Sequence, residues 1–416
     1  MSFFKLSPRF RIYTSVSSFL AVLKDIILMR TTTGRACEAL EKEMQKRFII
    51  DYSLCVPQGR VGIYLAVKAL IHTGQEVILS PYTIADVINM VICAGGIPVF
   101  ADIERETCNI NPSEIEKLIN KNTGAVMITH LHGLACNMDR IVEICKISNV
   151  PLIEDAAQAF SAKYNGKTVG TFGDIGVYSF GMYKNLTSFY GGIIVTPHNH
   201  IYNKICEERN TFPFSEINWF LKKFMKGLFT TIVTSTPLFQ LLVYRIFRFG
   251  HLHNIRFINR FVETELDLTE KDEIPDNYLR KMTPMQARLV LLKIDNVEND
   301  NLIRIQYAQI YHDGLFGLSG IILPPLKIDE SHIYTYYPIQ CHDRKALMRW
   351  LMKCRSDVGV QHLKNTADLP AFNKYFRNCP VARETAKSVI LLPTYPSYSR
   401  KMIKKNINSI QSFFAK

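Results

Sequence analysis

Closely spaced cysteine pairs are missing from this chain of 416 residues. Its 10 cysteines are scattered, and none stands in a C-x-x-C pair or at metal-ligand spacing. This distribution argues against a cysteine-based zinc site and is typical of free thiols in a reducing compartment. The segment HLHG would place His130 and His132 on one face of a strand, but no third ligand lies nearby in the sequence. We therefore predict no metal site.

The chain also lacks internal repeats, low-complexity tracts and a recognisable signal peptide. Residues 1–35 are basic and partly apolar, but Lys24 and Asp25 interrupt the apolar run and no small-residue cleavage site follows. This pattern argues against a secretory leader and predicts an amphipathic N-terminal segment. We accordingly expect a cytoplasmic protein, with association at the inner face of the membrane as the alternative.

Acidic residues are absent from residues 217–261. The cations of this segment stand among aromatic and aliphatic residues and are Lys222, Lys223, Lys226, Arg245, Arg248, Arg256 and Arg260. The uncharged run 227–244 approaches the roughly 20 residues of a spanning helix, but it contains Pro237 and several hydroxyl residues. Three interpretations stay open: a helical hairpin packed on the domain or on a partner subunit, a helix on the membrane surface, and a spanning helix.

The whole chain is basic, with a formal net charge of +13 and a pI of about 9.2. Such a charge favours anionic partners, among them nucleotide phosphates, nucleic acids and acidic membranes. The cations of residues 217–261 are mixed with apolar residues, which suits a lipid surface better than the phosphates of a nucleic acid. We expect no nucleic-acid partner.

Apolar strands alternate with helical patterns from about residue 38. Strand patterns include 76–80, 97–103 and 150–160, and helical patterns include 56–71, 85–96, 111–121 and one long amphipathic helix over 283–315. Alternation of this kind indicates a parallel sheet between helices, with ligands beyond the carboxyl ends of the strands. The predicted parts are an N-terminal segment (1–35), a large α/β domain (36–204), a basic hydrophobic helical insertion (205–275), and a long helix with a small α+β domain (276–416).

Three signals stand at predicted strand ends. Asp155 closes the apolar strand in IEDAAQAF, Lys184 follows the glycine turns of GTFGDIGVYSFGMYKN, and VPQGRVGIY turns at Gly59 before a helix. Taken singly, the acid could cap a helix and the lysine could extend to the surface. Together they suit pyridoxal phosphate (PLP). The lysine would form a Schiff base, the acid would keep the pyridine nitrogen protonated, and the helix start would hold the phosphate.

These blocks resemble a known family. HLHGLACNMDRI, IEDAAQAFSAKYNGKTVGTFGDIGVYSFGMYKNLT and GGIIVT occur in the order of the DegT/DnrJ/EryC1/StrS family of sugar aminotransferases. SPYTIADVINMVICAGGIPVFADI and CPVARETAKSVILLPTYP are similar to its earlier and C-terminal blocks, so the resemblance covers roughly residues 30–200 and 276–412. It implies the fold-type-I PLP-dependent transferase architecture, in which a large domain holds a mostly parallel seven-stranded sheet and a small α+β domain follows.

The resemblance also implies roles for matching residues. Lys184 would carry the cofactor and move the proton, Asp155 would bind the pyridine nitrogen, Gln158 would face the ring oxygen, and Ser179 would hydrogen-bond the phosphate. Proton transfer by a positioned amine is typically worth about 10²–10⁴-fold in rate. A relative with histidine in place of the lysine would suggest dehydration, so Lys184 favours amino transfer.

Several positions depart from the family pattern. The phosphate turn, usually Gly-Thr, is Gly59-Arg60 here. Both residues would offer backbone N–H groups, and the Arg60 side chain either grips the phosphate or points to solvent. Ile84 stands where an aromatic residue normally stacks on the cofactor, and Tyr82 either substitutes for it or lies in the core.

The family forms homodimers whose sites lie at the interface, so a two-fold dimer is implied. An asparagine normally crosses the dimer to the phosphate, and in the shifted segment NYLRKMT either Asn277 or Arg280 would take that role. The C-terminal substrate segment is reduced to residues 361–363. The cofactor shell is therefore kept better than the substrate shell.

The sequence thus predicts a PLP-dependent aminotransferase. It would move an amino group from an amino acid, glutamate by family inference, to a nucleotide-linked or lipid-linked keto sugar in polysaccharide or secondary-metabolite biosynthesis. The alternatives are a sugar dehydratase and a non-catalytic relative that acts at a membrane surface.

Overall fold

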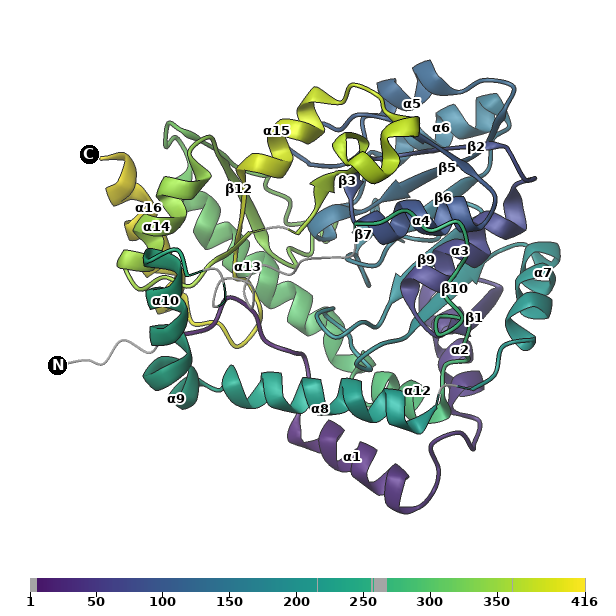
Figure 1. The fold of residues 1–416 in the computed structure, drawn as a ribbon, viewed down its shortest axis with the longest axis horizontal. Coiled ribbons are helices and arrows are strands. Elements are labelled where there is room, and N and C mark those ends of the chain that lie inside the picture. Colours follow the sequence, from purple (N-terminus) through teal and green to yellow (C-terminus); the bar gives the residue numbers. More distant parts are fainter. Residues whose placement is uncertain (1–5, 215, 256, 258–267, 361, 416) are drawn as a thin grey trace.

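A seven-stranded sheet forms the centre of the computed structural model, which describes all residues except 1–5, 215, 256, 258–267, 361 and 416 (Figure 1). The strand order is β1-β10-β9-β6-β5-β2-β4. The strands are β1 Tyr52–Val56, β2 Glu76–Leu79, β4 Ile97–Phe100, β5 Thr123–Thr129, β6 Leu152–Asp155, β9 Ile175–Ser179 and β10 Gly192–Thr196. Among these strands only β10 runs against the others. The sequence prediction of a mostly parallel sheet is confirmed.

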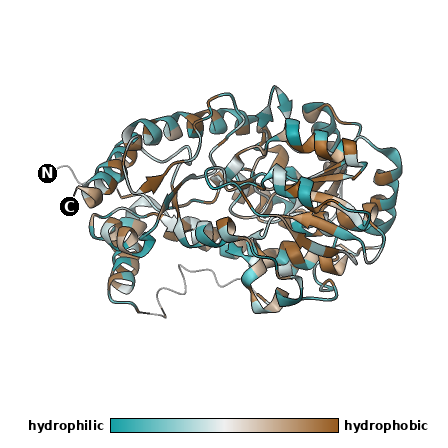
Figure 2. Ribbon diagram, turned by 90° about the horizontal axis from the view of Figure 1, so that it is seen from above, coloured by the Kyte–Doolittle hydropathy of each residue, from teal (hydrophilic) through white to brown (hydrophobic). Residues whose placement is uncertain are grey.

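Helices cover both faces of this sheet because successive strand residues point to opposite sides. Val77 and Ile153 pack under α3, α4 and α7, whereas their neighbours Ile78 and Leu152 pack under α5 and α6. The second face is completed by α2 beside β1 and β10. These helices are α2 Ala36–Phe48, α3 Gly59–Leu70, α4 Ala85–Cys93, α5 Pro112–Leu118, α6 Met138–Ser148 and α7 Asn199–Asn210. Figure 2 shows hydrophobic residues concentrated on the central strands.

A small domain follows, built on an antiparallel sheet of order β11-β12-β15-β13. Its strands are β11 Ile321–Ile322, β12 Tyr337–Cys341, β13 Gly359–Val360 and β15 Val389–Leu392, and its helices are α14 Arg344–Lys353, α15 Pro380–Ser388 and α16 Arg400–Phe414. Two short strand pairs lie outside both sheets: β3 Tyr82–Thr83 with β14 Lys364–Asn365, and β7 Lys163–Tyr164 with β8 Lys167–Thr168.

The connection between the domains corrects one sequence prediction. Instead of one long helix over 283–315, α12 Pro284–Leu291 and α13 Val297–Leu315 are separated by a short 3-10 turn. At Lys293 the backbone leaves the helical region, with φ −126°. The Lys293 ammonium donates a 2.6 Å hydrogen bond to the carbonyl oxygen of Tyr13. The side chain at the break is therefore fixed by a contact with the distant N-terminal segment. Helical periodicity within residues 283–315 cannot indicate such a contact.

The N-terminal helix α1 and helix α8 of the insertion lie along one edge of the molecule, and α8 leads into α9 and α10 (Figure 1). Their helices are α1 Val16–Ile27, α8 Ile217–Val233, α9 Thr236–Leu238, the π-helical turn Phe239–Val243 and α10 Tyr244–Leu252. Phe19 of α1 and Phe224 of α8 have ring centroids 5.4 Å apart, and both rings lie against Phe189. The two helices therefore pack together on the loop that follows β9.

Membrane-spanning character is limited to one bent pair within the described residues. No single helix there has the length and hydropathy of a span. Helix α8 passes such a test only together with residues 236–252, and the two parts meet at an angle of 64°.

Candidate active site

The carboxyl end of β6 carries a buried acid. Asp155 is the last residue of this strand and is 5% exposed. Its Oδ1 accepts a hydrogen bond from the Ala157 N–H at 3.0 Å, and its Oδ2 accepts one from the Thr129 hydroxyl at 3.4 Å. Burial raises the pKa of Asp155, while the Ala157 hydrogen bond and the charge of Lys184 oppose this rise. A buried carboxylate held this way is suited to pairing with a cation.

The loop after β9 brings a lysine toward the same strand end. Lys184 is partly buried, and its backbone N–H bonds to the Gly181 carbonyl at 3.1 Å. Burial lowers the pKa of the Lys184 ammonium; the charge of Asp155 opposes this and the charge of Arg60 adds to it. No hydrogen bond or ion pair to its amine is found among the described residues. The amine is thus biased toward its neutral, nucleophilic form.

The start of α3 lies directly against the end of β9. A side chain at Gly59 would place its Cβ only 2.9 Å from Cβ of Ser179, so glycine is needed for this close approach. Gln58, the residue before the helix, gives no side-chain cap. The first N–H groups of α3 therefore remain available to an anion, beside a hydroxyl that accepts only a 3.3 Å bond from the Gly181 N–H.

Gln158 lies in the loop that follows Asp155 and β6. Its Oε1 accepts a 3.1 Å hydrogen bond from the His132 N–H, which leaves its side-chain amide nitrogen free to donate. The His132 imidazole is 1% exposed, neither ring nitrogen has a partner among the described residues, and burial lowers its pKa to about 4. The Gln158 amide is therefore held by the backbone of a residue whose own imidazole is neutral, a contact that sequence spacing did not indicate.

These residues fit PLP. An anion cradle, a buried carboxylate without an ion pair to any described residue and an amine of lowered pKa occupy neighbouring strand ends. They match a phosphate, a protonated pyridine nitrogen and an aldehyde respectively. The structure therefore brings Asp155, Gln158, Ser179, Lys184 and Gly59 to one edge of the sheet.

The Arg60 side chain takes neither of its two predicted directions. Its guanidinium bonds to the carboxylate of Asp86 and, at 3.0 Å, to the hydroxyl of Tyr278. Lys271 approaches the other Asp86 oxygen at 2.9 Å. The Arg60 side chain is therefore engaged in a salt-bridge network. Only its backbone N–H, in the first turn of α3, is left for an anion at the helix start.

Three further predicted residues lie away from this cluster or at its rim. Tyr82 is fully buried in the core, its hydroxyl has no partner within the described chain, and burial raises its pKa. It occupies the core position of its two predicted alternatives. Asn277 is exposed and Arg280 is partly exposed, on either side of the Tyr278 that contacts Arg60.

A second acid organises the site and was missed by sequence reasoning. Glu154 is fully buried and accepts hydrogen bonds from the N–H groups of Gly170, Phe172 and Gly173 at 2.6–2.7 Å. His130 bonds the same carboxylate at 3.1 Å and accepts from the Cys136 N–H. Glu154 thereby anchors the loop before β9 to β6. His130 is engaged in this network, and no group of three or more metal-ligating side chains occurs in the described part of the chain.

Helix α8 covers the loop that carries Lys184. Trp219 meets Tyr190 edge to face at a centroid distance of 4.0 Å, and Phe220 and Phe224 pack against Phe189. Helix α8 of the insertion therefore packs on the loop that carries Lys184. Among the three sequence interpretations this favours the packed hairpin, and the face of α8 that points away from the loop is still open to a partner.

Comparison with known proteins gives the same assignment. The sequence model of the DegT/DnrJ/EryC1/StrS aminotransferase family matches residues 18–212 and 264–411. A GDP-perosamine synthase of Escherichia coli O157:H7 is 38% identical over 392 residues, which cover 92% of each chain. A spore coat polysaccharide biosynthesis protein of Bacillus subtilis is 25% identical over 91% of this chain and 89% of its own. The crystal structure of an aminotransferase from Psychrobacter cryohalolentis has the same fold, with a TM-score of 0.77, 22% identity and 99% coverage of both chains.

Proposed function

Because the chain belongs to the DegT/DnrJ/EryC1/StrS aminotransferase family and is a PLP-dependent aminotransferase, we propose that it aminates a keto sugar carried on a diphosphate. The donor is an amino acid, glutamate in the first instance. The product enters a polysaccharide or secondary metabolite. The observation that carries this proposal is the convergence of Lys184, Asp155 and the α3 start at one sheet edge, joined to 38% identity with a GDP-perosamine synthase.

Each residue of the cluster has a part in this proposal. PLP, when bound, supplies an aldehyde for the amino group and a ring that accepts electrons from the reacting carbon. Lys184 would take a proton from that carbon and deliver it to the carbon that carried the aldehyde oxygen. Asp155 would balance the positive charge of the ring nitrogen, and the Gln158 amide would donate to the ring oxygen. Ser179 and the N–H groups of Gly59 and Arg60 bind the phosphate.

The donor half of the reaction tests the proposal directly. Holoenzyme mixed with L-glutamate and no acceptor should release about one 2-oxoglutarate per site and lose its visible absorbance band. A nucleotide-linked keto sugar should then restore the band. Failure of glutamate, glutamine and aspartate alike to change the spectrum would refute an aminotransferase that uses these donors.

A two-fold homodimer completes the proposed site. Asn277 or Arg280 of one protomer would reach the phosphate in the partner's site. Asn277 is exposed, as a residue that reaches a partner subunit must be. Sedimentation velocity of the holoenzyme should show a species with twice the mass of the chain.

Contact with an anionic membrane surface is the proposed role of the outer faces of α1 and α8. On α1, Val16, Leu20, Leu23 and Ile27 form an exposed stripe at helical spacing. On α8, the exposed apolar residues are Ile217, Met225, Phe229 and Ile232, beside exposed Lys222 and Lys226. The acid of α1, Asp25, points inward to Arg288 at 2.7 Å. An apolar stripe edged by cations, with no outward acid within either helix, suits anionic lipid.

Vesicle binding tests this surface. Wild-type protein should sediment with phosphatidylglycerol vesicles at low salt and much less with phosphatidylcholine vesicles. Phe229→Glu should weaken this binding by about 10–100-fold, since burial of such a side chain is worth roughly 1.5–3 kcal/mol. Ile147→Glu, which changes an exposed apolar residue on the distant α6, should have no effect.

A second copy of the chain is the competing occupant of the same face. If Phe229→Glu converts a sedimenting dimer to a monomer and the wild type ignores both vesicle types, this face is the dimer interface and the lipid proposal is wrong. If the variant stays dimeric and loses vesicle binding, the face binds lipid.

A further inference from the structure

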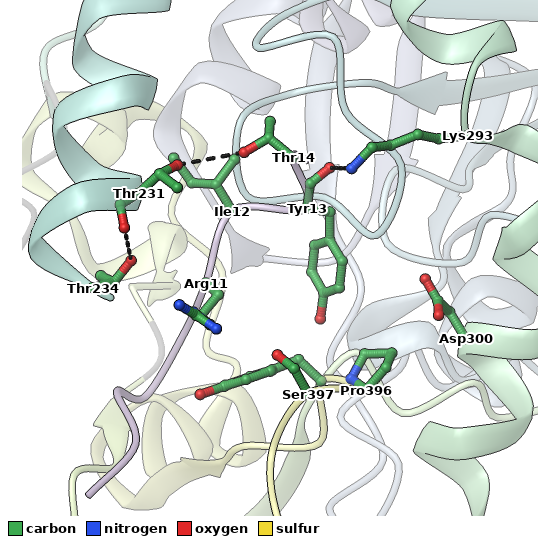
Figure 3. Close-up of a pocket in the computed structure, with 11 residues that line it drawn as sticks. Arg11, Ile12, Tyr13, Thr14, Thr231, Thr234, Lys293, Asp300, Pro396 and Ser397 are labelled. Atoms are coloured by element: carbon green, nitrogen blue, oxygen red, sulfur yellow. Dashed lines mark hydrogen bonds between the residues drawn. The ribbon is translucent and has the colours of Figure 1, made fainter. Parts of the chain in front are cut away.

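A cavity of about 260 Å³ lies where four separate parts of the chain meet (Figure 3). Its wall comes from the N-terminal segment, the end of α8, the region between α12 and α13, and the loop after β15. The lining residues are Arg11, Ile12, Tyr13, Thr14, Thr231, Thr234, Lys293, Asp300, Tyr395, Pro396 and Ser397. Because α8 belongs to the insertion, part of this wall is specific to chains that carry such an insertion.

The cavity contains positive charge that is not neutralised by an ion pair. The Arg11 guanidinium has neither a hydrogen bond nor an ion pair with any residue that the structure describes. The Lys293 ammonium uses one proton on the Tyr13 carbonyl at 2.6 Å and likewise lacks an ion pair within the described chain. By contrast Arg9, two residues before Arg11, is fully paired with Asp357 at 2.6 Å.

The segment that presents Arg11 is held in place on both sides. Arg9 bonds Asp357 through its backbone N–H and its guanidinium, and the Tyr395 hydroxyl donates to the Pro8 carbonyl at 2.8 Å. Lys293 holds the carbonyl of Tyr13. Arg11 is thus a cation without a partner in the described chain, on a fixed backbone, which is the condition for binding an anion with little loss of conformational freedom.

The cavity adjoins the loop that carries Lys184. Phe10, next to Arg11, meets Tyr183 edge to face at a centroid distance of 5.2 Å. Ile12 lines the cavity and packs in the same apolar cluster as Met182. The cavity is therefore a neighbour of the catalytic loop and is separate from the phosphate cradle at α3.

The opposite side of the cavity carries an acid. Asp300 lies on the opposite side of the Tyr13 ring from Arg11 in Figure 3. It makes no ion-pair contact with a described residue; burial raises its pKa, and the charges of Arg304 and Lys293 oppose this rise. A carboxylate repels a second anion but accepts hydrogen bonds from sugar hydroxyls. A ligand with phosphate toward Arg11 and hydroxyl groups toward Asp300 therefore matches both sides.

We propose that this cavity binds the diphosphate of the activated sugar, with Arg11 and Lys293 on the phosphates and Asp300 on a hydroxyl of the adjoining sugar. At about 260 Å³ the cavity lies just below the usual range of ligand pockets, roughly 300–1,000 Å³, a size that suits a diphosphate better than a whole nucleotide sugar. The carrier beyond the phosphates, nucleoside or lipid, extends outside. This inference rests on the proposed function and assigns its substrate class to named residues.

Binding of inorganic pyrophosphate to the PLP-loaded enzyme tests the cavity, since loading fills the cofactor's own phosphate cradle. Calorimetry should show one site. Arg11→Gln should weaken binding by about 10–100-fold, the usual effect of removing a charge-assisted hydrogen bond. Lys146→Gln removes an exposed charge on α6 and should leave the affinity unchanged. Equal affinity in wild type and Arg11→Gln would overturn the proposal.

The two sources of a diphosphate are separated by comparing GDP with geranyl diphosphate. If GDP binds more tightly than pyrophosphate and this binding is lost in Arg11→Gln, the carrier is a nucleoside. If geranyl diphosphate behaves in this way instead, the carrier is a lipid. Binding of both probes that ignores Arg11 counts against the cavity.

The glutamate half-reaction uses no diphosphate and separates the two proposals. If it proceeds normally while pyrophosphate binding does not depend on Arg11, only the cavity assignment fails. If it is absent while Arg11-dependent binding persists, the proposed function fails. A normal half-reaction in Arg11→Gln also shows that this variant is folded.

Discussion

Lys184→Ala protein should be colourless after free PLP is removed and should have lost at least about 10²–10⁴-fold in the rate of amino transfer. Two losses coincide in this variant: the attachment point for the cofactor and the group that moves the proton. The fold should survive, because Lys184 is only partly buried and its amine makes no hydrogen bond with a described residue. Absorbance spectra with and without borohydride, followed by single-turnover kinetics with glutamate, measure both losses.

Lys146→Ala provides the matched control, since it removes an exposed lysine from α6. It should keep both the absorbance band and the rate. A band that persists in Lys184→Ala and is still bleached by borohydride would assign the covalent attachment to another lysine and would contradict the role of Lys184.

Asp155→Asn should separate activity from stability. The amide keeps the shape of the side chain, and its oxygen can still accept from the Ala157 N–H. It cannot hold the positive charge on the ring nitrogen, so we expect a fall of about 10²–10³-fold in kcat, comparable to the loss of one group that stabilises developing charge. A variant with wild-type kcat would mean that Asp155 is structural.

The apoprotein of Asp155→Asn should be at least as stable as the wild type at pH 7. Burial raises the pKa of Asp155 in the folded chain, so the folded state binds the proton more tightly than the unfolded state and ionisation destabilises the fold. The penalty is fully present above the folded pKa and vanishes below the unfolded value of about 3.9. The difference in Tm between variant and wild type should therefore shrink as pH is lowered toward 4. A variant that is less stable than the wild type at pH 7 would contradict this.

The parts of the site that sequence reasoning predicted are those that follow from strand ends. Asp155, Ser179 and the turn at Gly59 each stand where an apolar strand stops. In a parallel sheet such ends meet at one edge, so local patterns were enough to place them together. Lys184 could be added because its loop begins at the same edge.

The parts that sequence reasoning missed depend on partners distant in the chain. Arg60 turns to Asp86 and Tyr278, the second of which is 218 positions away. Glu154 shares its strand with Asp155, yet it points to the other face and is satisfied by three backbone N–H groups of the loop 170–173. Strand periodicity indicates that neighbours face opposite ways, but it does not identify which of two adjacent acids faces the ligand.

The long helix was mispredicted for a related reason. Residues 283–315 have helical propensity on both sides of Lys293 and contain no proline beyond Pro284 and no glycine before Gly314. The break coincides with the contact between Lys293 and Tyr13. Tertiary contacts of this kind override local propensity, and they leave no mark in the pattern of a single segment.

The packing of α8 on the loop that carries Lys184 has a consequence for how such chains can diverge. Phe189 and Tyr190, a few residues after Lys184, are buried by Phe220, Phe224 and Trp219 of the insertion. A descendant that lost the insertion would expose both aromatic residues close to Lys184. A descendant that lost those aromatic residues would leave Trp219, Phe220 and Phe224 of α8 without their packing partners. Either change alone would expose apolar side chains that are now buried. Helix α8 and the loop beneath it are therefore expected to change together. Among related chains, the two segments should be gained, altered or lost as one unit.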